Sequence, residues 1–206
     1  MEEGHNSVAA YVLAGGQSTR MGRDKALLEL EPGHTMLEHA LTLAASVAQR
    51  VTLVAPRERY SKLRWAGEII EDDVHGQGPL AGIAAALKHS QSELNLVLAI
   101  DTPLVTKSLL KFLLTRAASN DAPALVPAVD NTRQPLCAVY RRSFLPFAQQ
   151  ALAVGDNKIG IVLDRAQAAL LPESELLEAG FAAELFRNVN TPEEYERLRA
   201  GKLEMT

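Results

Sequence analysis

The segment from Leu13 to Lys25, L-A-G-G-Q-S-T-R-M-G-R-D-K, combines the residue types that bind polyphosphates. Its three glycines allow unusual backbone angles and let amide groups approach a ligand closely. Arg20, Arg23 and Lys25 place three positive charges within six positions of a chain whose net charge is −4. Backbone amides and basic side chains at the end of a strand make an anion-binding concavity. The segment therefore predicts a polyphosphate cradle.

Two better-known phosphate-binding motifs do not fit the spacing. A Walker loop needs a glycine, four residues, and then Gly-Lys followed by Ser or Thr. Here Gly22 has Gln17 five positions before it and Arg23 after it. A dinucleotide fingerprint needs G-x-G-x-x-G, but Gln17 stands two positions after Gly15. The sequence therefore supports neither a P-loop NTPase nor an NAD-dependent dehydrogenase.

Two carboxylates follow short apolar runs and are candidates for the same site. Asp101 comes directly after Leu94–Ile100, and Asp72 comes directly after Glu68–Glu71. In a parallel sheet such strand ends lie at one edge, where ligands of open α/β sheets bind. Magnesium prefers one or two carboxylates together with phosphate oxygens and water. We expect Asp101 to bind the metal; the alternative is that its carboxylate only caps the turn before Pro103.

Apolar runs alternate with helical segments along the chain. Strands are expected at Val8–Ala14, Val51–Ala55, Glu68–Glu71, Leu94–Ile100 and Ala124–Val129. Helices are expected after the Thr35/Glu38 capping box, over Pro79–His89, Lys107–Ala118 and Ser143–Ala153, and from the Thr191-Pro192-Glu193-Glu194 cap. This alternation predicts an α/β fold whose mostly parallel sheet is covered on both faces.

Composition narrows the class of protein. The 206 residues are 47% hydrophobic and 22% charged, with one cysteine, which excludes a disordered, collagen-like or disulfide-built protein. No repeat or linker divides the chain, so one domain spanning 1–206 is expected. Lys plus Arg number 21 against 25 Asp plus Glu, so no nucleic-acid partner is expected. The acidic start and the lack of a run of about 20 apolar residues indicate a cytoplasmic protein with no membrane contact.

The pattern L-A-G-G-x-S-x-R-M-G-x-D-K resembles the signature of molybdenum cofactor guanylyltransferases, the MobA family. Three later segments match in order. Glu71-Asp72 followed by Gly78–Gly82 resembles the family's E-D…G-P-L-A-G, Asp101–Pro103 resembles its metal-binding D-x-P, and Asn188–Glu193 resembles N-x-N-T-P-E. The resemblance is close from residue 8 to about 105 and intermittent to about 198.

The resemblance implies a fold, a reaction and a division of the chain. The fold would be the Rossmann-like three-layer sandwich of nucleotidyltransferases. The reaction would transfer GMP from GTP to the terminal phosphate of molybdopterin, giving molybdopterin guanine dinucleotide and pyrophosphate, with Mg²⁺ as cofactor. Residues from about 8 to 105 would bind nucleotide and metal, and residues from about 106 to 198 would bind the acceptor. Other proteins of molybdenum cofactor biosynthesis are implied as partners.

Roles for individual residues follow from the chemistry and from the resemblance. Two anionic substrates must meet, so fixed positive charge and a divalent cation are needed. We therefore expect Arg20, Lys25 and Asp101 to be catalytic. The resemblance implies that GTP is bound by Leu13, Ala14, Gly15, Lys25, Asp72 and Asp101, and that molybdopterin is bound by Asn188 and Asn190. The alternative for the two asparagines is that they shape the turn into the following helix.

The sequence is also compatible with other functions. The Asp24-Lys25 ending favours guanylyl over cytidylyl transfer by resemblance, but Val54 stands where family members often carry asparagine. A molybdopterin cytidylyltransferase, a sugar-phosphate nucleotidyltransferase and a non-catalytic nucleotide-binding regulator remain alternatives. Retention of Arg20, Lys25 and Asp101 argues against the regulator.

Two further groups of residues are expected to be structural. Cys137 lies in an apolar, strand-like stretch and is expected in the core. The basic residues Arg57, Arg59, Lys62 and Arg64 are expected on the solvated face of a helix; the alternative is that they contact an anionic substrate or partner. The five histidines show no zinc-site spacing.

Overall fold

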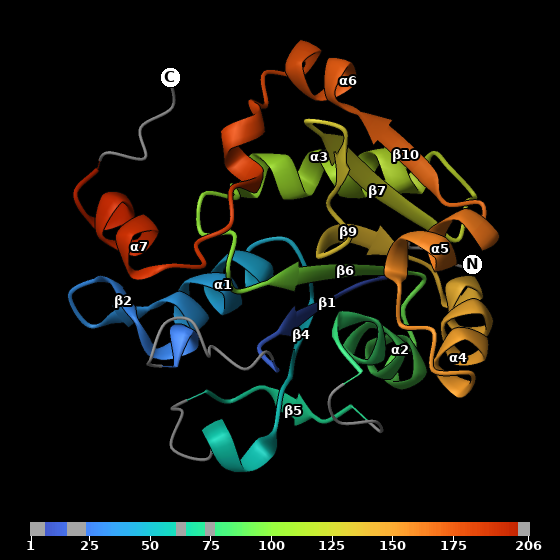
Figure 1. Cartoon of the computed structure of the whole chain (residues 1–206), viewed down its shortest axis with the longest axis horizontal. Coiled ribbons are helices and arrows are strands. Elements are labelled where there is room, and N and C mark those ends of the chain that lie inside the picture. Colours follow the sequence, from blue (N-terminus) through green and yellow to red (C-terminus); the bar gives the residue numbers. More distant parts are fainter. Residues whose placement is uncertain (1–6, 16–23, 61–64, 73–76, 202–206) are drawn as a thin grey trace, which may run out of the picture.

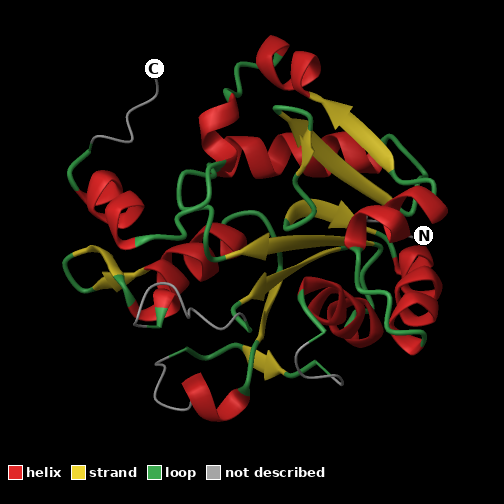
Figure 2. Cartoon of the chain, viewed as in Figure 1, coloured by secondary structure: helices red, strands yellow, loops and turns green. Residues whose placement is uncertain are grey.

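A computed structural model describes residues 7–15, 24–60, 65–72 and 77–201. The chain forms one mixed sheet with helices on both faces, as Figures 1 and 2 show. The eight strands of this sheet are β1 (Val8–Leu13), β4 (Arg50–Val54), β5 (Glu68–Ile70), β6 (Leu94–Ala99), β7 (Ala124–Val129), β8 (Thr132–Arg133), β9 (Cys137–Tyr140) and β10 (Ala169–Pro172). A separate two-stranded sheet pairs β2 (Glu29–Glu31) with β3 (His34–Thr35).

The strand order is β10-β7-β9-β6-β1-β4-β5, with β8 paired to β7. The pairs β1/β4, β1/β6, β4/β5 and β10/β7 are parallel. β9 runs antiparallel to both β6 and β7, and β8 runs antiparallel to β7. The predicted α/β fold with a mostly parallel sheet is confirmed, and β9 is the strand that interrupts it.

Seven α-helices and four 3-10 turns lie around the sheet in the described part of the chain. The helices are α1 (Met36–Ala45), α2 (Pro79–His89), α3 (Lys107–Ala118), α4 (Leu145–Ala153), α5 (Ile159–Arg165), α6 (Glu173–Glu178) and α7 (Pro192–Arg199). The 3-10 turns are η1 (Lys25–Leu27), η2 (Arg57–Tyr60), η3 (Arg142–Phe144) and η4 (Ala183–Phe186). Among these residues, no helix is both long enough and apolar enough to span a membrane.

Alternation along each strand divides the core into two sides. In β6, Leu96 and Leu98 pack into a cluster with residues of α1 and α3, whereas Val97 packs with residues of α2, α4 and α5. Successive side chains of a strand point to opposite faces, so a strand that is apolar at nearly every position is buried on both. This is why the segments predicted as strands are continuous runs of apolar residues rather than alternating apolar and polar residues.

Most predicted elements are found, with three corrections. The helix expected over Ser143–Ala153 is a 3-10 turn at Arg142–Phe144 followed by α4. The helix expected for the basic cluster is only the short turn η2; Lys62 and Arg64 lie outside the described residues. The elements β2, β3, β8, β10, α5 and α6 were not predicted, because each has at most seven residues and short segments carry little periodicity.

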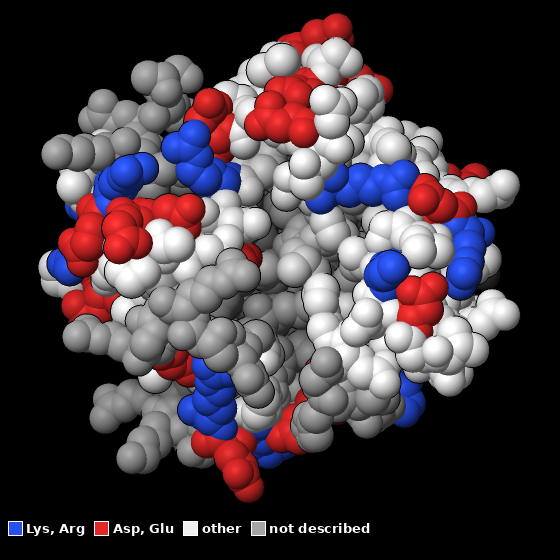
Figure 3. All heavy atoms as spheres, viewed as in Figure 1, with Lys and Arg blue, Asp and Glu red and all other residues white. Residues whose placement is uncertain are grey.

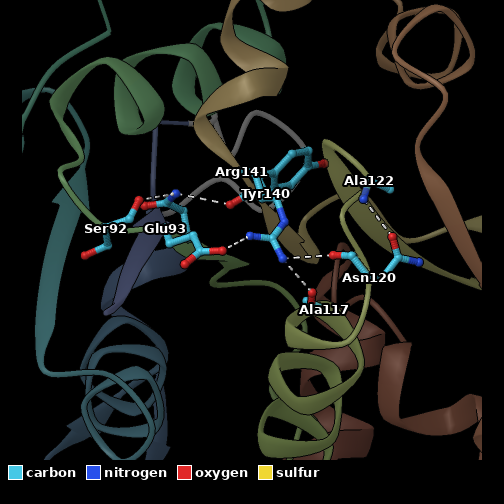
Figure 4. Close-up of polar contacts among 8 residues, drawn as sticks. Ser92, Glu93, Ala117, Asn120, Ala122, Tyr140 and Arg141 are labelled. Atoms are coloured by element: carbon cyan, nitrogen blue, oxygen red, sulfur yellow. Dashed lines mark hydrogen bonds and ion pairs between the residues drawn. The ribbon is translucent and has the colours of Figure 1, made fainter. Parts of the chain in front are cut away.

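A network of polar side chains connects the elements at the edge of the sheet where β6 begins (Figure 4). The fully buried Asn95 of β6 donates to the carbonyls of Ser92 (3.3 Å) and Tyr140 (3.1 Å), and its Oδ1 accepts from the Ser90 hydroxyl. The neighbouring Arg141 pairs with Glu93 and donates to two carbonyls at the end of α3. These bonds join β6, β9, the end of α2 and the end of α3 at the edge where β6 starts.

Replacing Asn95 with alanine is expected to lower the free energy of unfolding by about 1–3 kcal/mol, because buried polar groups would be left without partners. Chemical denaturation of both proteins measures the difference. The matched control is Asn157→Ala, since Asn157 is exposed after α4 and should change stability by less than about 0.5 kcal/mol. Equal stabilities for Asn95→Ala and the control would contradict this description of the network.

Candidate active site

The parallel strands β1, β4, β5 and β6 end at one edge of the sheet. Ala14 and Gly15 follow β1, Asp72 lies two residues beyond β5, and Asp101 lies two residues beyond β6. The sequence-based expectation that these segments emerge at the same edge agrees with the topology. This edge is opposite the one fastened by Asn95.

Lys25 is the central side chain at this edge. Its Nζ donates to Asn190 Oδ1 at 2.8 Å and lies 3.6 Å from Asp101 Oδ2. The Lys25 side chain is 11% exposed and that of Asp101 is 26% exposed, so water screens this group less than a surface pair. Three residues that are far apart in the sequence therefore form one polar cluster with one ammonium, one carboxylate and one amide.

The 3-10 turn η1 determines where Lys25 lies. Asp24 is its N-cap, and Asp24 Oδ1 accepts from the backbone N–H of Ala26 at 3.1 Å. Carboxylates suit this position because the first amides of a helical turn have no partner within it. Lys25 begins the turn, and its side chain reaches Asp101 and Asn190 from there.

The segment before α7 brings Asn190 to the cluster. The N–H of Val189 donates to the backbone carbonyl of Asp101 at 2.8 Å, and Val189 is buried. Glu194 Oε2 accepts from the N–H groups of Asn190 (2.6 Å) and Thr191 (3.0 Å). Asn188 is exposed, so the structure brings Asn190 rather than Asn188 to Lys25 and Asp101.

The end of β1 is held by backbone and packing contacts. Ala14 is buried, and its N–H donates to the Val54 carbonyl at 3.0 Å. Among the described residues, no atom lies within 4 Å of a Cβ built on Gly15, so packing against them does not require glycine there. In α2, a Cβ on Gly82 would lie 3.0 Å from Leu13, so this glycine lets α2 pack closely on β1.

Arg20 lies outside the described residues. Asp72 is partly buried at the end of the segment after β5. Val54 is buried against α2 in a small apolar cluster, so its side chain offers the site no polar group.

Two features of this edge were missed from the sequence. Glu194 was identified only as a capping glutamate, although it also binds the N–H of Asn190. Arg59 was expected on a solvated face, but its side chain is 26% exposed and its Nε donates to Asp24 Oδ2 at 2.6 Å. The carboxylate of Asp24, directly before Lys25, is the signal that could have pointed to a cationic partner such as Arg59.

Charges of both signs are mixed on the face of the molecule in Figure 3. No single-signed field covers that face, which agrees with the small net charge of −4. Attraction of a small anion must therefore come from individual groups such as Lys25 rather than from the whole surface.

Replacing Glu194 with alanine is expected to remove a reciprocal cap and to lower the free energy of unfolding by about 0.5–2 kcal/mol. The N–H of Asn190 holds the pKa of Glu194 below its usual range. The contribution is therefore fully present above the ordinary glutamate pKa of about 4.3 and is lost as pH falls through the lowered value. Denaturation at pH 7 and at pH 3 tests this, with Glu193→Ala of the same helix as control. An effect of Glu194→Ala that does not decrease between pH 7 and pH 3 would contradict it.

Comparisons with known proteins agree with this geometry. The family model of the MobA-like NTP transferase domain matches residues 10–169. The chain is 34% identical over 192 residues to a probable molybdenum cofactor guanylyltransferase of Carboxydothermus hydrogenoformans, covering 93% of this chain and 95% of that protein. It is 36% identical over 194 residues to one of Nostoc sp., covering 92% and 89%.

Solved structures lead to the same group. The molybdopterin-guanine dinucleotide biosynthesis protein A of Archaeoglobus fulgidus has a TM-score of 0.82 and 30% identity, covering 96% of this chain and all of that one. A CMP-2-keto-3-deoxy-manno-octonic acid synthetase, at 18% identity and a TM-score of 0.71 with 94% and 97% covered, shows a shared fold. From the family model and the relatives together, the chain belongs to the MobA-like NTP transferases, in the group of molybdenum cofactor guanylyltransferases.

Proposed function

We propose that this protein transfers GMP from GTP to the terminal phosphate of molybdopterin, producing molybdopterin guanine dinucleotide and pyrophosphate. The observation that carries the proposal is the contact of Lys25 Nζ with Asn190 and its 3.6 Å separation from Asp101. It joins the segment after β1, the segment after β6 and the segment before α7 in one place. Relatives named as molybdenum cofactor guanylyltransferases support the same reaction.

Charge is the main obstacle to this reaction. The acceptor phosphate must approach the α-phosphorus of GTP, so negative charge moves toward negative charge. Lys25 supplies a fixed positive charge with little exposure to water, where it stabilises developing charge more strongly than on the surface. Arg20, with its planar fork of donors, is assigned a paired contact with phosphate oxygens.

Nucleotidyltransferases of this kind use a divalent metal ion, and the residues present fit magnesium. Asp101 offers a partly exposed carboxylate at the site. The described residues contain no group of three or more side chains of the metal-ligating types. One or two carboxylates completed by substrate phosphates and water are what Mg²⁺ prefers. Bound there, Mg²⁺ would neutralise phosphate charge and polarise the α-phosphoryl group.

Lys25 and Asp101 neutralise each other before substrates bind. With substrates bound, Asp101 would hold the metal ion and Lys25 would contact a phosphate oxygen. Asn190, whose amide has both donors and an acceptor, is assigned with Asn188 to the molybdopterin side. Leu13, Ala14 and Gly15 are assigned to the guanine nucleotide, largely through backbone groups, and Asp72 is assigned to hold it. No protein base is needed, because the terminal phosphate of molybdopterin is already ionised near pH 7.

This assignment divides the single domain in two. Residues from about 8 to 105 bind nucleotide and metal, and residues from about 106 to 198 bind molybdopterin. The bond between Lys25 and Asn190 supports placing the reacting phosphates where these two parts meet.

One reaction tests the proposal. The protein is incubated with Mg²⁺, molybdopterin and equal amounts of GTP, CTP, ATP and UTP, and the products are identified by mass spectrometry. A guanine dinucleotide that requires both Mg²⁺ and molybdopterin is expected. A cytosine dinucleotide would move the protein to cytidylyl transfer. No dinucleotide from folded protein and intact molybdopterin would contradict the proposal.

A further inference from the structure

The 3-10 turn η2 contacts the active-site segments with two consecutive side chains. We propose that Arg59 and Tyr60 are positioning residues for the transfer: Arg59 holds Lys25 in place through Asp24, and Tyr60 holds the end of β1 through the Ala14 carbonyl. This inference rests on the proposed function, because it names residues that set the geometry of that site.

Arg59 acts on Asp24 at short range. Its Nε donates to Asp24 Oδ2 at 2.6 Å, and the two side chains are 26% and 19% exposed. A charge-assisted bond of this length that is largely removed from water is stronger than an ordinary surface ion pair. The bond spans 35 positions of the sequence, so it joins two separate segments rather than neighbours on one turn.

The two carboxylate oxygens of Asp24 accept hydrogen bonds from two different segments. Oδ2 accepts from Arg59, and Oδ1 accepts from the N–H of Ala26 in η1. The bond to Arg59 therefore fixes the carboxylate that caps the turn in which Lys25 stands. Loss of the guanidinium would let this carboxylate rotate. The turn that positions the Lys25 backbone would then no longer be fixed by its N-cap.

Arg59 also compensates charge beside the site. Asp24 is adjacent to Lys25, so an uncompensated carboxylate there would repel the triphosphate that Lys25 attracts. With Arg59 bonded to Asp24, the positive charge of Lys25 remains available to the substrate phosphates. These two effects of Arg59, on the cap of η1 and on the charge beside Lys25, pass through Asp24.

Tyr60 holds the other segment of the site. Its side chain is 3% exposed, and its Oη donates to the Ala14 carbonyl at 3.1 Å. Ala14 precedes Gly15, whose backbone is assigned to the nucleotide. Burial raises the pKa of Tyr60 well above its usual range, with Asp24 contributing, so the hydroxyl remains a donor throughout the working range of pH. The Arg59 guanidinium lies 5.7 Å from the Tyr60 ring centroid, which joins the two contacts in one unit.

The residues 14 and 24 flank the glycine- and arginine-rich segment in the sequence. One short turn therefore contacts a residue on each side of this segment along the sequence. If Arg59 only stabilised the fold, its removal would lower stability without changing the kinetics of protein that remains folded. A positioning role instead predicts a kinetic effect that depends on Asp24.

A double-mutant cycle separates these two roles. Arg59→Ala, Asp24→Asn and the double variant are compared with wild type for kcat, for KM of GTP and for the equilibrium Kd of Mg²⁺-GTP. Asp24→Asn keeps an acceptor for the Ala26 N–H but removes the charge that Arg59 binds. Arg59→Ala is expected to lower kcat/KM for GTP by between about tenfold and 10²-fold, whereas adding Arg59→Ala to Asp24→Asn should change it less than about threefold.

Two variants control for the loss of a similar group elsewhere. Arg57→Ala removes a neighbouring guanidinium that donates to the Ile69 carbonyl, and Tyr140→Phe removes a buried tyrosine hydroxyl that donates to the Pro135 carbonyl. Both are expected to keep wild-type kinetics. Tyr60→Phe, which removes the hydroxyl that donates to the Ala14 carbonyl and also interacts with Asp24, is expected to raise KM for GTP by between about threefold and tenfold.

The outcomes separate the inference from the proposed function. Wild-type kinetics for folded Arg59→Ala, or an equal loss from Arg59→Ala in the wild-type and Asp24→Asn backgrounds, would overturn the positioning role while leaving guanylyl transfer intact. If the wild type binds GTP but forms no dinucleotide, the proposed function fails. The double-mutant cycle is then evaluated from the Kd of Mg²⁺-GTP, where Arg59→Ala should again have a smaller effect in the Asp24→Asn background. Folded wild type that binds no GTP would overturn both.

Discussion

Lys25→Ala is expected to lower kcat/KM for GTP by about 10²–10³, the usual effect of removing one donor that stabilises transition-state charge. Lys25 is the ammonium that contacts Asn190 and lies beside Asp101, and its low exposure makes its charge effective. Initial rates of dinucleotide formation at saturating molybdopterin measure the loss.

Because Lys25 is nearly buried, the alanine variant also leaves a small cavity. Lys25→Met keeps most of the aliphatic volume without the charge and should be equally slow. The control is Lys111→Ala, on the exposed side of α3, which should keep the wild-type rate. A Lys25→Met enzyme with wild-type kcat/KM would remove Lys25 from the mechanism.

Asp101→Asn is expected to lower turnover by at least about 10²-fold and to raise the Mg²⁺ concentration needed for half-maximal rate. The substitution preserves size and shape but removes the negative charge with which a carboxylate binds Mg²⁺. Rates measured over a range of Mg²⁺ concentrations report both effects.

The backbone hydrogen bond of Asp101 is retained in this variant. Its carbonyl accepts from the N–H of Val189, and the side-chain substitution leaves that bond in place. The segment before α7 should therefore remain docked, although loss of the carboxylate beside the nearly buried Lys25 ammonium should make this variant less stable than Asp121→Asn, an exposed control. An Asp101→Asn enzyme with unchanged Mg²⁺ dependence would contradict the assignment of the metal ligand.

The sequence was sufficient for the framework that positions the site. Continuous apolar runs such as Ala124–Val129 mark strands buried on both faces, and the observed β7 has the same bounds. Pro79 and the Thr35/Glu38 capping box mark helix starts that the structure confirms. Because strands and helices alternate, the ends of β1, β5 and β6 could be expected at one edge. The resemblance then supplied the reaction class.

Contacts between distant segments could not be predicted in the same way. The bond between Lys25 and Asn190 spans 165 positions, and no local pattern encodes it. The antiparallel direction of β9 depends on how the chain returns after β7, which periodicity does not show. Arg59 looked like a solvated residue because the sequence around it is basic, and only the structure shows its bond to Asp24, 35 positions away.

In the proposed reaction, GMP passes directly between two substrates held at the same site, with Lys25 acting as a charge and not as a nucleophile. Isotope exchange between labelled pyrophosphate and GTP tests this most directly, with and without molybdopterin. We predict exchange only when molybdopterin is present, and no mass increase of the protein on incubation with Mg²⁺-GTP alone. Exchange without molybdopterin, together with a guanylylated protein that is absent in Lys25→Met, would contradict direct transfer.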